Sequence, residues 1–320
     1  MRRRAFGETG LDCSEIGLGT WALGSGVYGE VERTEAHNLI GQALDTGINF
    51  FDTAPLYGNK YEDGVAEIVL GEGLGTRKDQ AIISTKFGRT ARQVMPPRFN
   101  ADEAKKSCDD SLKRLGRDWI DLFFFHSPFE SDEIEDDVWQ GLTELKQNGK
   151  IRFIGHSVSM YDDTKDLSEQ WMSERKIDAV QIVLSPFNRE TRPLIATAAG
   201  LGRAVVAREC MANGFLSGGI RKDTVFPKGS LNARYSREEI AERVDYASAL
   251  SECLISGEIA SLPQAAYRWT LDQPGVSLAL AGPRSVAELM DGIAASRAEA
   301  YSGETLAAAE VIHKKEFSPA

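Results

Sequence analysis

The strongest constraint on the fold is an eightfold alternation between short apolar runs and stretches with a helical pattern. The runs are partly β-branched and only a few residues long, which suits buried strands. They cover residues 15–20, 48–52, 81–86, 120–125, 151–156, 179–183, 203–207 and 276–282. Strands that alternate with helices predict a parallel sheet, and eight such units favour an α/β protein with a closed (β/α)8 barrel over an open sheet.

The helical stretches between the runs place polar residues where they would face water. They include residues 33–46, 101–115, 135–148, 161–174 and 191–199. An opening segment is expected to form a short hairpin that closes the bottom of the barrel. We therefore predict that residues 1–320 form a single barrel domain, since no linker rich in Pro, Gly or Ser divides the chain.

The alternation is broken between the seventh and eighth strands, where residues 208–275 exceed one loop and one helix. We interpret the glycine-rich residues 208–235 as a long loop at the carboxyl ends of the strands, because long loops in compact domains are usually functional or disordered. Residues 237–273 are expected to form two helices. A terminal helix is expected over residues 303–315.

Composition narrows the classes of partner. The chain has 320 residues, which suits one barrel of roughly 250 residues with insertions. A formal charge of −11 argues against a general affinity for nucleic acid or anionic membranes. The four cysteines show no metal-binding spacing and are interpreted as free thiols. Because neither a secretory signal pattern nor a membrane-spanning apolar run is present, a cytoplasmic location is expected.

Polar, protonatable side chains follow three successive predicted strands. Asp52 ends the second run and Tyr57 lies on the loop after it, while Lys86 and His126 end the third and fourth runs. In a parallel barrel, the chemistry gathers at the carboxyl ends of the strands. The four side chains are therefore expected to meet at one end of the barrel.

The strings that carry these residues resemble the aldo-keto reductase superfamily. They are FDTAPLYG at residues 51–58, STK at 84–86 and FFFHSP at 123–128. The resemblance extends from IGLGTW at residues 16–21 to GPRS at 282–285, which is nearly the whole chain. It implies an NAD(P)(H)-dependent oxidoreductase that transfers hydride between nicotinamide and a small carbonyl or alcohol substrate, such as an aldehyde, a ketone or a sugar.

The resemblance also assigns catalytic roles. Tyr57 would be the general acid/base, and Lys86 would lower its pKa because a nearby ammonium favours the phenolate. Asp52 would pair with Lys86 and keep it charged. His126 would hydrogen-bond the carbonyl oxygen. No metal is expected, since side chains already supply the proton donor and the contacts to the oxygen.

The predicted cofactor site differs from a Rossmann site, because no GxGxxG opens a helix after the first strand. Residues 281–285 follow the eighth strand and open a helix, so backbone NH groups from Gly282 onward, with Ser285, are placed to hold a phosphate. Arg284 adds a positive charge suited to a 2′-phosphate. NADP, with NADPH preferred, is therefore the expected cofactor, and NAD is not excluded.

Further cofactor residues are implied by the resemblance. They are Ser157 and Gln181 for the nicotinamide carboxamide, and Gly214, Leu216, Ser217 and Gly218 for the pyrophosphate. The chain departs from the family at three positions. Val158 replaces an Asn, Arg208 stands where an aromatic ring commonly stacks on the nicotinamide, and Gly292 stands where an Asn commonly contacts the adenine.

The substrate pocket is predicted from aromatic residues on loops near the strand ends. The candidates are Trp21, Tyr28, Phe87 and Phe129, and core packing is the alternative role for each. Three other functions stay open. They are a sugar or alcohol dehydrogenase working in the oxidative direction, a cofactor-sensing regulatory subunit with the same fold, and an unrelated barrel enzyme such as a lyase or isomerase. The sequence does not predict an oligomeric state.

Overall fold

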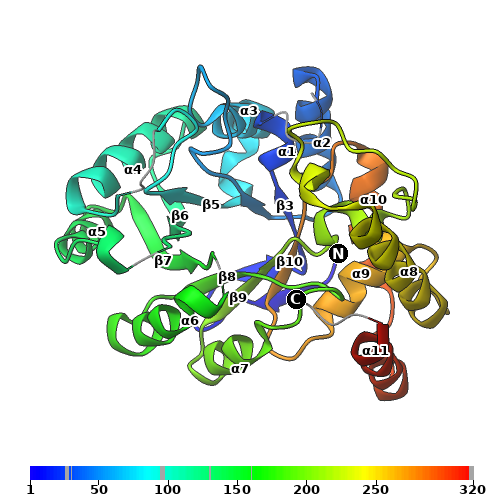
Figure 1. Cartoon of the computed structure of the whole chain (residues 1–320). Coiled ribbons are helices and arrows are strands. Elements are labelled where there is room, and N and C mark those ends of the chain that lie inside the picture. The colour runs from blue at the N-terminus through cyan, green and yellow to red at the C-terminus, as the bar shows by residue number, and fades with distance from the viewer. Residues whose placement is uncertain (26–28, 30, 94–97, 130, 160, 317–320) are drawn as a thin grey trace.

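The computed structural model describes residues 1–25, 29, 31–93, 98–129, 131–159 and 161–316. Eight parallel strands close into a barrel in chain order, with β10 between β3 and β9 (Figure 1). Each strand overlaps one predicted run, so the predicted (β/α)8 barrel is confirmed. The strands are β3 (Ile16–Gly19), β4 (Phe50–Asp52), β5 (Ile82–Phe87), β6 (Ile120–His126), β7 (Ile151–Ser157), β8 (Ala179–Val183), β9 (Ala204–Arg208) and β10 (Leu278–Ala281).

Helices surround the barrel, as Figure 1 shows. They are α1 (Trp21–Gly24), α2 (Arg33–Asp45), α3 (Val65–Leu74), α4 (Ala101–Leu115), α5 (Val138–Gln147), α6 (Tyr161–Gln170), α7 (Arg192–Gly200), α8 (Arg237–Leu254), α9 (Leu262–Leu271), α10 (Val286–Arg297) and α11 (Gly303–Glu316). The two helices expected within residues 237–273 and the terminal helix are confirmed. No helix in the described part of the chain combines the length and apolar character needed to cross a bilayer.

Local sequence signals explain where several helices begin and end. Asn100 caps α4 by accepting a hydrogen bond from the Glu103 amide at 2.9 Å, and Gly116 ends that helix with a φ of 62°. Ser236 and Glu239 form a reciprocal capping box at the start of α8. Such pairs satisfy backbone groups that the first turn of a helix leaves without partners.

Two helices differ from the prediction. The acidic stretch after residue 130 forms a 3-10 turn, η2 (Ser131–Glu133), and α5 begins only at Val138. Helix α6 ends at Gln170 and continues as a π-helical turn, η3 (Trp171–Arg175), which Lys176 ends in the left-handed conformation. Wider turns of this kind are not visible in a 3.6-residue pattern.

The predicted hairpin fills the lower end of the barrel. It consists of β1 (Arg3–Ala5) and β2 (Asp12–Ser14), which pair antiparallel. Phe6 and Cys13 are fully buried and belong to the same core cluster as Phe50 of β4 and Phe124 of β6. Apolar side chains therefore occupy the lower lumen, and the polar side chains at the carboxyl ends of the strands lie at the opposite end of the barrel.

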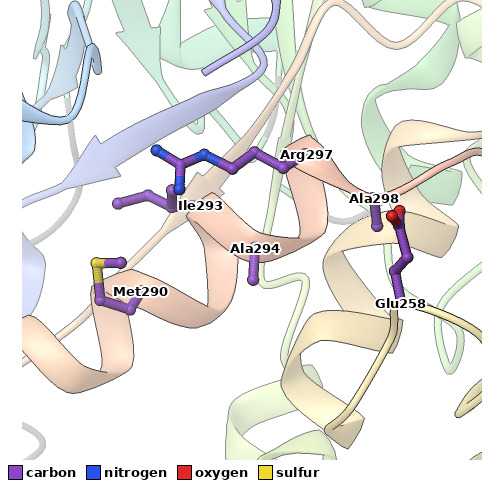
Figure 2. A pocket seen from close by; sticks show the side chains of 6 residues that line it. All are labelled: Glu258, Met290, Ile293, Ala294, Arg297 and Ala298. Carbon is purple, nitrogen blue, oxygen red and sulfur yellow. The ribbon is translucent and has the colours of Figure 1, made fainter.

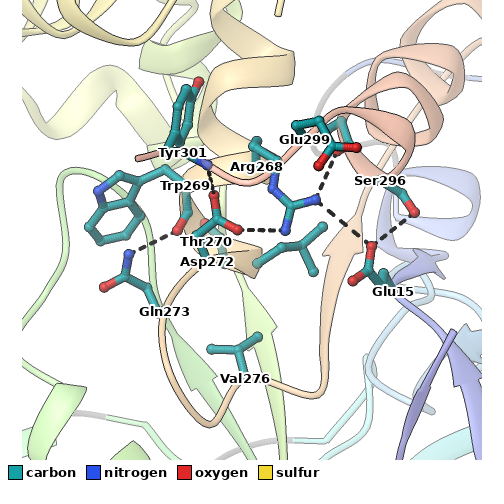
Figure 3. Close-up of polar contacts among 12 residues, drawn as sticks. Glu15, Arg268, Trp269, Thr270, Asp272, Gln273, Val276, Ser296, Glu299 and Tyr301 are labelled. Carbon is teal, nitrogen blue, oxygen red and sulfur yellow. Dashed lines mark hydrogen bonds and ion pairs between the residues drawn. The ribbon is translucent and has the colours of Figure 1, made fainter. Parts of the chain in front are cut away.

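A buried ionic cluster fastens the hairpin and β3 to the outer helices (Figure 3). Arg268 of α9 is 1% exposed; it donates to Asp272 at 2.8 Å and lies 3.9 Å from Glu15. Glu15 also accepts from Arg4 at 2.6 Å and from Ser296 of α10 at 3.1 Å. The cluster joins segments from both ends of the chain.

Between β9 and β10 the chain runs through the predicted long loop before it reaches α8. The loop contains two short 3-10 segments, η4 (Ala212–Ser217) and η5 (Leu231–Arg234). The first of them contacts α8 and α9. One part of this loop is therefore anchored against the outer helices.

Candidate active site

The base of the site is an ion pair between neighbouring strands. The register of β4 and β5 places Asp52 opposite Ser84, two residues before Lys86. The Lys86 Nζ donates to Asp52 Oδ1 at 2.9 Å and to Oδ2 at 2.7 Å, and to the Thr53 carbonyl at 2.9 Å. Lys86 is fully buried and Asp52 is 2% exposed. The ammonium is thus held in one position with its charge matched.

Tyr57 approaches this pair from the loop after β4. Lys86 Nζ donates to the Tyr57 Oη at 3.1 Å, and the Tyr57 ring stacks on Trp21 with centroids 6.1 Å apart. The loop is tight: a Cβ at Gly58 would collide with the Glu62 carbonyl. A residue without a side chain is therefore required at position 58 for this path of the loop.

His126 completes the predicted set at the end of β6. Its ring meets the Tyr57 ring edge to face, with centroids 6.0 Å apart. The side chain is nearly buried, and Nδ1 has no hydrogen-bond partner among the described residues. The structure thus brings Asp52, Tyr57, Lys86 and His126 together, as expected.

Burial and charge set the protonation states of the group. Burial raises the pKa of Tyr57, as does Asp52, and Lys86 counters by favouring the phenolate. The net direction is upward, so the expectation of a lowered Tyr57 pKa is not met and the phenol carries its proton at neutral pH. Burial opposes the charge of Lys86, but Asp52 and Tyr57 outweigh it and raise the pKa of the lysine.

The pKa of His126 moves in the opposite direction. Burial holds it well below its ordinary value, and the positive charges of Lys86, Arg89 and Arg208 lower it further. The imidazole is therefore neutral at physiological pH and carries one N–H. A neutral imidazole donates a hydrogen bond to an oxygen without adding a charge to the site.

Ser84 is a site residue that the sequence analysis missed. Asp52 Oδ1 accepts from Ser84 Oγ at 2.7 Å and from Gln181 Nε2 at 2.9 Å, besides Lys86. The strand period offers a signal for Ser84, because residues two apart on β5 share a face. Gln181 was expected to bind cofactor, and in this structure its amide nitrogen donates a hydrogen bond to Asp52.

Three cofactor candidates line the opposite side of the barrel mouth. Ser157 Oγ donates to Gln181 Oε1 at 3.1 Å, which extends the hydrogen-bonded chain from Asp52 to β7. Arg208 ends β9; its Nη2 donates to the Val158 carbonyl at 2.9 Å and its Nη1 pairs with Glu209. The charge of Arg208 is therefore compensated by its neighbour in the sequence.

The loop after β9 contains two glycines with positive φ, a backbone that lets another molecule come close to the chain. Gly214 and Gly218 have φ values of 90° and 75°, and a Cβ at Gly218 would meet nothing within 4 Å. Leu216 is buried, and Ser217 Oγ accepts from the Gly219 amide at 3.1 Å. The glycines leave room for another molecule, whereas Leu216 anchors the loop in the core.

At the start of α10, where the sequence predicts a phosphate site, a carboxylate of the protein itself is bound. Ser285 caps the helix by accepting from the Glu288 amide at 3.3 Å. The Glu288 carboxylate accepts from the Arg284 backbone amide at 2.8 Å and from its Nη2 at 3.1 Å. Gly282 has open space at its Cβ position. Gly292 lies on the inner face of α10, where a Cβ would sit 3.2 Å from Ile16.

The predicted pocket aromatics divide into three groups. Trp21 stacks on Tyr57, and Phe129 lies three residues after His126 beneath the Arg89 guanidinium, 4.1 Å from its carbon. Phe87 is fully buried and stacks on Phe123 with centroids 4.8 Å apart. It belongs to the core between the strands and the helices and is not brought to the mouth. Tyr28 lies outside the described residues.

A surface depression of about 270 Å³ lies elsewhere, along α10 (Figure 2). Its lining includes Met290, Arg297 and Glu258, and none of the four catalytic candidates. It is therefore separate from the site described above.

The comparisons with known proteins agree with the fold. The sequence model of the Aldo/keto reductase family matches residues 15–312. The chain is 29% identical over 299 residues to the aldo-keto reductase YhdN of Bacillus subtilis, covering 90% of this chain and 87% of that protein. It is 26% identical over 316 residues to the NADH-specific methylglyoxal reductase of Escherichia coli, covering 92% and 93%.

A solved structure gives the same result. The glycerol dehydrogenase AKR11B4 from Gluconobacter oxydans superposes with a TM-score of 0.82 at 26% identity, covering 97% of this chain and 94% of that one. The family match spans nearly the whole chain and includes every residue of the Asp52, Tyr57, Lys86 and His126 group. This chain therefore belongs to the aldo/keto reductase family of oxidoreductases.

Proposed function

We propose that the protein is an NAD(P)(H)-dependent oxidoreductase that transfers hydride between nicotinamide and a carbonyl or alcohol, with Tyr57 as general acid/base. One observation carries the proposal: Lys86 Nζ lies 2.7 Å from the Asp52 carboxylate and 3.1 Å from the Tyr57 hydroxyl. An ammonium held against a buried phenol stabilises the phenolate that remains after proton donation. A structural lysine would need no such contact.

The side chains divide the work of reduction. Tyr57 donates its phenolic proton to the carbonyl oxygen, and Lys86 stabilises the phenolate that is left. Neutral His126 donates its N–H to the same oxygen and holds it in place as charge develops. Bound nicotinamide dinucleotide supplies or accepts the hydride. In the oxidative direction, the Tyr57 phenolate accepts the proton of an alcohol.

The residues of the barrel mouth fit such a cofactor. Ser157 and Gln181 offer a hydroxyl and an amide, and Gly218 after β9 leaves its Cβ position open. The start of α10 supplies backbone NH groups for a phosphate. Arg284 favours NADPH through its charge, whereas Glu288 disfavours a 2′-phosphate because its carboxylate already binds Arg284. We propose NADP(H) as the cofactor. The competition between Glu288 and the 2′-phosphate for Arg284 would set how much tighter NADP(H) binds than NAD(H).

The direct test is a fluorescence titration of the protein with NADPH and with NADH, followed by a panel of aldehydes, ketones and aldoses. Binding together with consumption of the reduced cofactor supports the proposal. A protein that binds reduced cofactor without consuming it is tested next with alcohols and oxidised cofactor. Binding without turnover in both assays indicates a cofactor-sensing protein. No binding to any of the four cofactor forms refutes the proposal.

A second candidate is oxidation of an alcohol or sugar as the main reaction. The similarity to the Gluconobacter oxydans glycerol dehydrogenase, at a TM-score of 0.82, favours it. The same four residues serve both directions. The ratio of the two rates, measured with a matched aldehyde and alcohol pair at neutral pH, distinguishes this candidate from a reductase.

A further inference from the structure

Arg89, which has no ion-pair partner among the described residues, lies near the four candidate catalytic side chains. Arg89 follows β5 by two residues, three positions after Lys86. Its guanidinium carbon lies 4.1 Å from the centroid of the Phe129 ring, three residues after His126. The stacked pair thus joins the two loops that leave the strands of Lys86 and His126.

The hydrogen-bonding state of Arg89 is unusual. Its Nε and Nη2 are shielded from solvent and have no hydrogen-bond partner among the described residues. These two nitrogens share one edge of the planar guanidinium, and that edge matches the two oxygens of a carboxylate. Buried donors are rarely left unpaired, because losing their hydration costs free energy that only a partner recovers.

The nearby acid does not pair with this arginine. Glu133 acts on Arg89 only through space, and its Oε2 instead accepts from the Phe129 amide at 2.7 Å. The other two cations of the mouth are matched, since Lys86 binds Asp52 and Arg208 binds Glu209. Burial lowers the pKa of Arg89, as expected for a charge without a close counterion. Within the described part of the chain, Arg89 is therefore a cation of the mouth without an ion-pair partner.

We propose that Arg89 is a specificity residue that binds a carboxylate on the substrate, so that the preferred substrates are carbonyl compounds or alcohols bearing a carboxylate. The inference rests on the proposed hydride transfer and adds the substrate class to it. In this arrangement the carboxylate pairs with the Nε and Nη2 groups of Arg89 while the reacting oxygen lies at Tyr57 and His126. Phe129 fixes the plane of the guanidinium, which orients its Nε and Nη2 donors before the substrate binds.

The test compares two aldehydes that differ only in charge, para-formylbenzoate and its methyl ester. For the unaltered protein we expect a higher kcat/KM for the carboxylate. In Arg89→Met this value should fall about 10-fold to 100-fold, while that for the ester stays within about threefold. Arg92→Met is the matched control, because Arg92 lies on the same loop, is exposed, and pairs with Asp63 at 3.0 Å.

A binding measurement separates this proposal from the proposed function. Calorimetric titration with para-(hydroxymethyl)benzoate should show binding that Arg89→Met weakens by about 10-fold and Arg92→Met leaves unchanged. Loss of that difference refutes the role of Arg89, even if both aldehydes are reduced. An equal fall for acid and ester in Arg89→Met also refutes it, because the residue would then be structural. Absence of turnover with every cofactor counts against the proposed function alone, and the titration still decides the role of Arg89.

Discussion

At the scale of single residues, we propose that proton transfer depends on the phenol of Tyr57 and on the Lys86 ammonium that contacts it. Tyr57→Phe removes the hydroxyl but keeps the ring that stacks on Trp21. We expect kcat to fall about 100-fold to 10,000-fold, the usual contribution of a positioned acid. Cofactor affinity, measured by fluorescence titration, should change little. A variant with nearly normal kcat would contradict the role assigned to Tyr57.

Ser84 allows a finer test of how Asp52 is held. Ser84→Ala removes the 2.7 Å hydrogen bond to Asp52 Oδ1 and leaves the other two donors in place. Losing one charge-assisted bond should lower kcat about tenfold, or ~1.4 kcal/mol in the activation barrier. The control is Thr85→Val, because Thr85 donates to Glu67 on the other face of β5 at 2.6 Å. That variant should lose thermal stability and keep its kcat, and equal kcat losses in both would argue against a special role for Ser84.

The residues of the site were predictable to different degrees. Asp52, Tyr57, Lys86 and His126 stand in recognisable strings near strand ends, so their convergence followed from the barrel topology. Phe87 shows the limit of such reasoning: it is next to Lys86 in sequence, but strand alternation turns it toward the helices. The state of Arg284 depends on a partner four residues away, and a positive charge in a sequence does not reveal whether it is already paired.

At the scale of elements, we propose that the start of α10 influences the choice between NADPH and NADH. Glu288→Gln removes the carboxylate that binds Arg284 at 3.1 Å, so that it no longer opposes a contact between Arg284 and a 2′-phosphate. Affinity for NADPH should rise about fivefold relative to NADH, since one charge at such an exposed site is worth ~1 kcal/mol. The effect should weaken at high salt.

The comparison is made by titrating both cofactors into the unaltered protein and the variant. Glu304→Gln on α11 is the control, because it changes the net charge equally at an exposed position on another helix. A ratio that stays constant in Glu288→Gln would show that Glu288 does not oppose the phosphate.

Element boundaries followed the strength of local signals. Residues 101–115 were predicted as a helix and form α4 over the same range, because Asn100 and Gly116 mark both ends. Helix α5 began three residues later than expected. Its N-cap, Asp137, makes no side-chain capping bond, so the acidic stretch before it provides no clear start signal. Long-range contacts decide such ends, and a short sequence window does not contain them.

At the scale of the whole molecule, buried neutral histidines predict how stability depends on pH. Burial lowers the pKa of His156 to about 3, and the pKa of His313 is about 4, with burial again the main cause. In the unfolded chain, histidine has a pKa of about 6.5 and takes up a proton first as the pH falls. The stability that these neutral histidines provide is present above about pH 6.5 and is lost as the pH falls toward their folded pKa values.

The measurement is denaturant unfolding at pH 7 and pH 4 for the unaltered protein and for His156→Asn. Between these pH values His156 alone should cost the unaltered protein about 3 kcal/mol of unfolding free energy, which the variant should not lose. The comparison uses the change with pH, so any constant loss from the substitution cancels. Equal changes in both proteins would show that His156 takes up its proton in the folded state.

The closed lower end of the barrel has one last consequence. Phe6 and Cys13 fill the lumen from below, so we expect reactants to approach Tyr57 and Lys86 from the carboxyl ends of the strands. If two reactants bind there together, we expect ordered binding, in which the reactant that enters last leaves first.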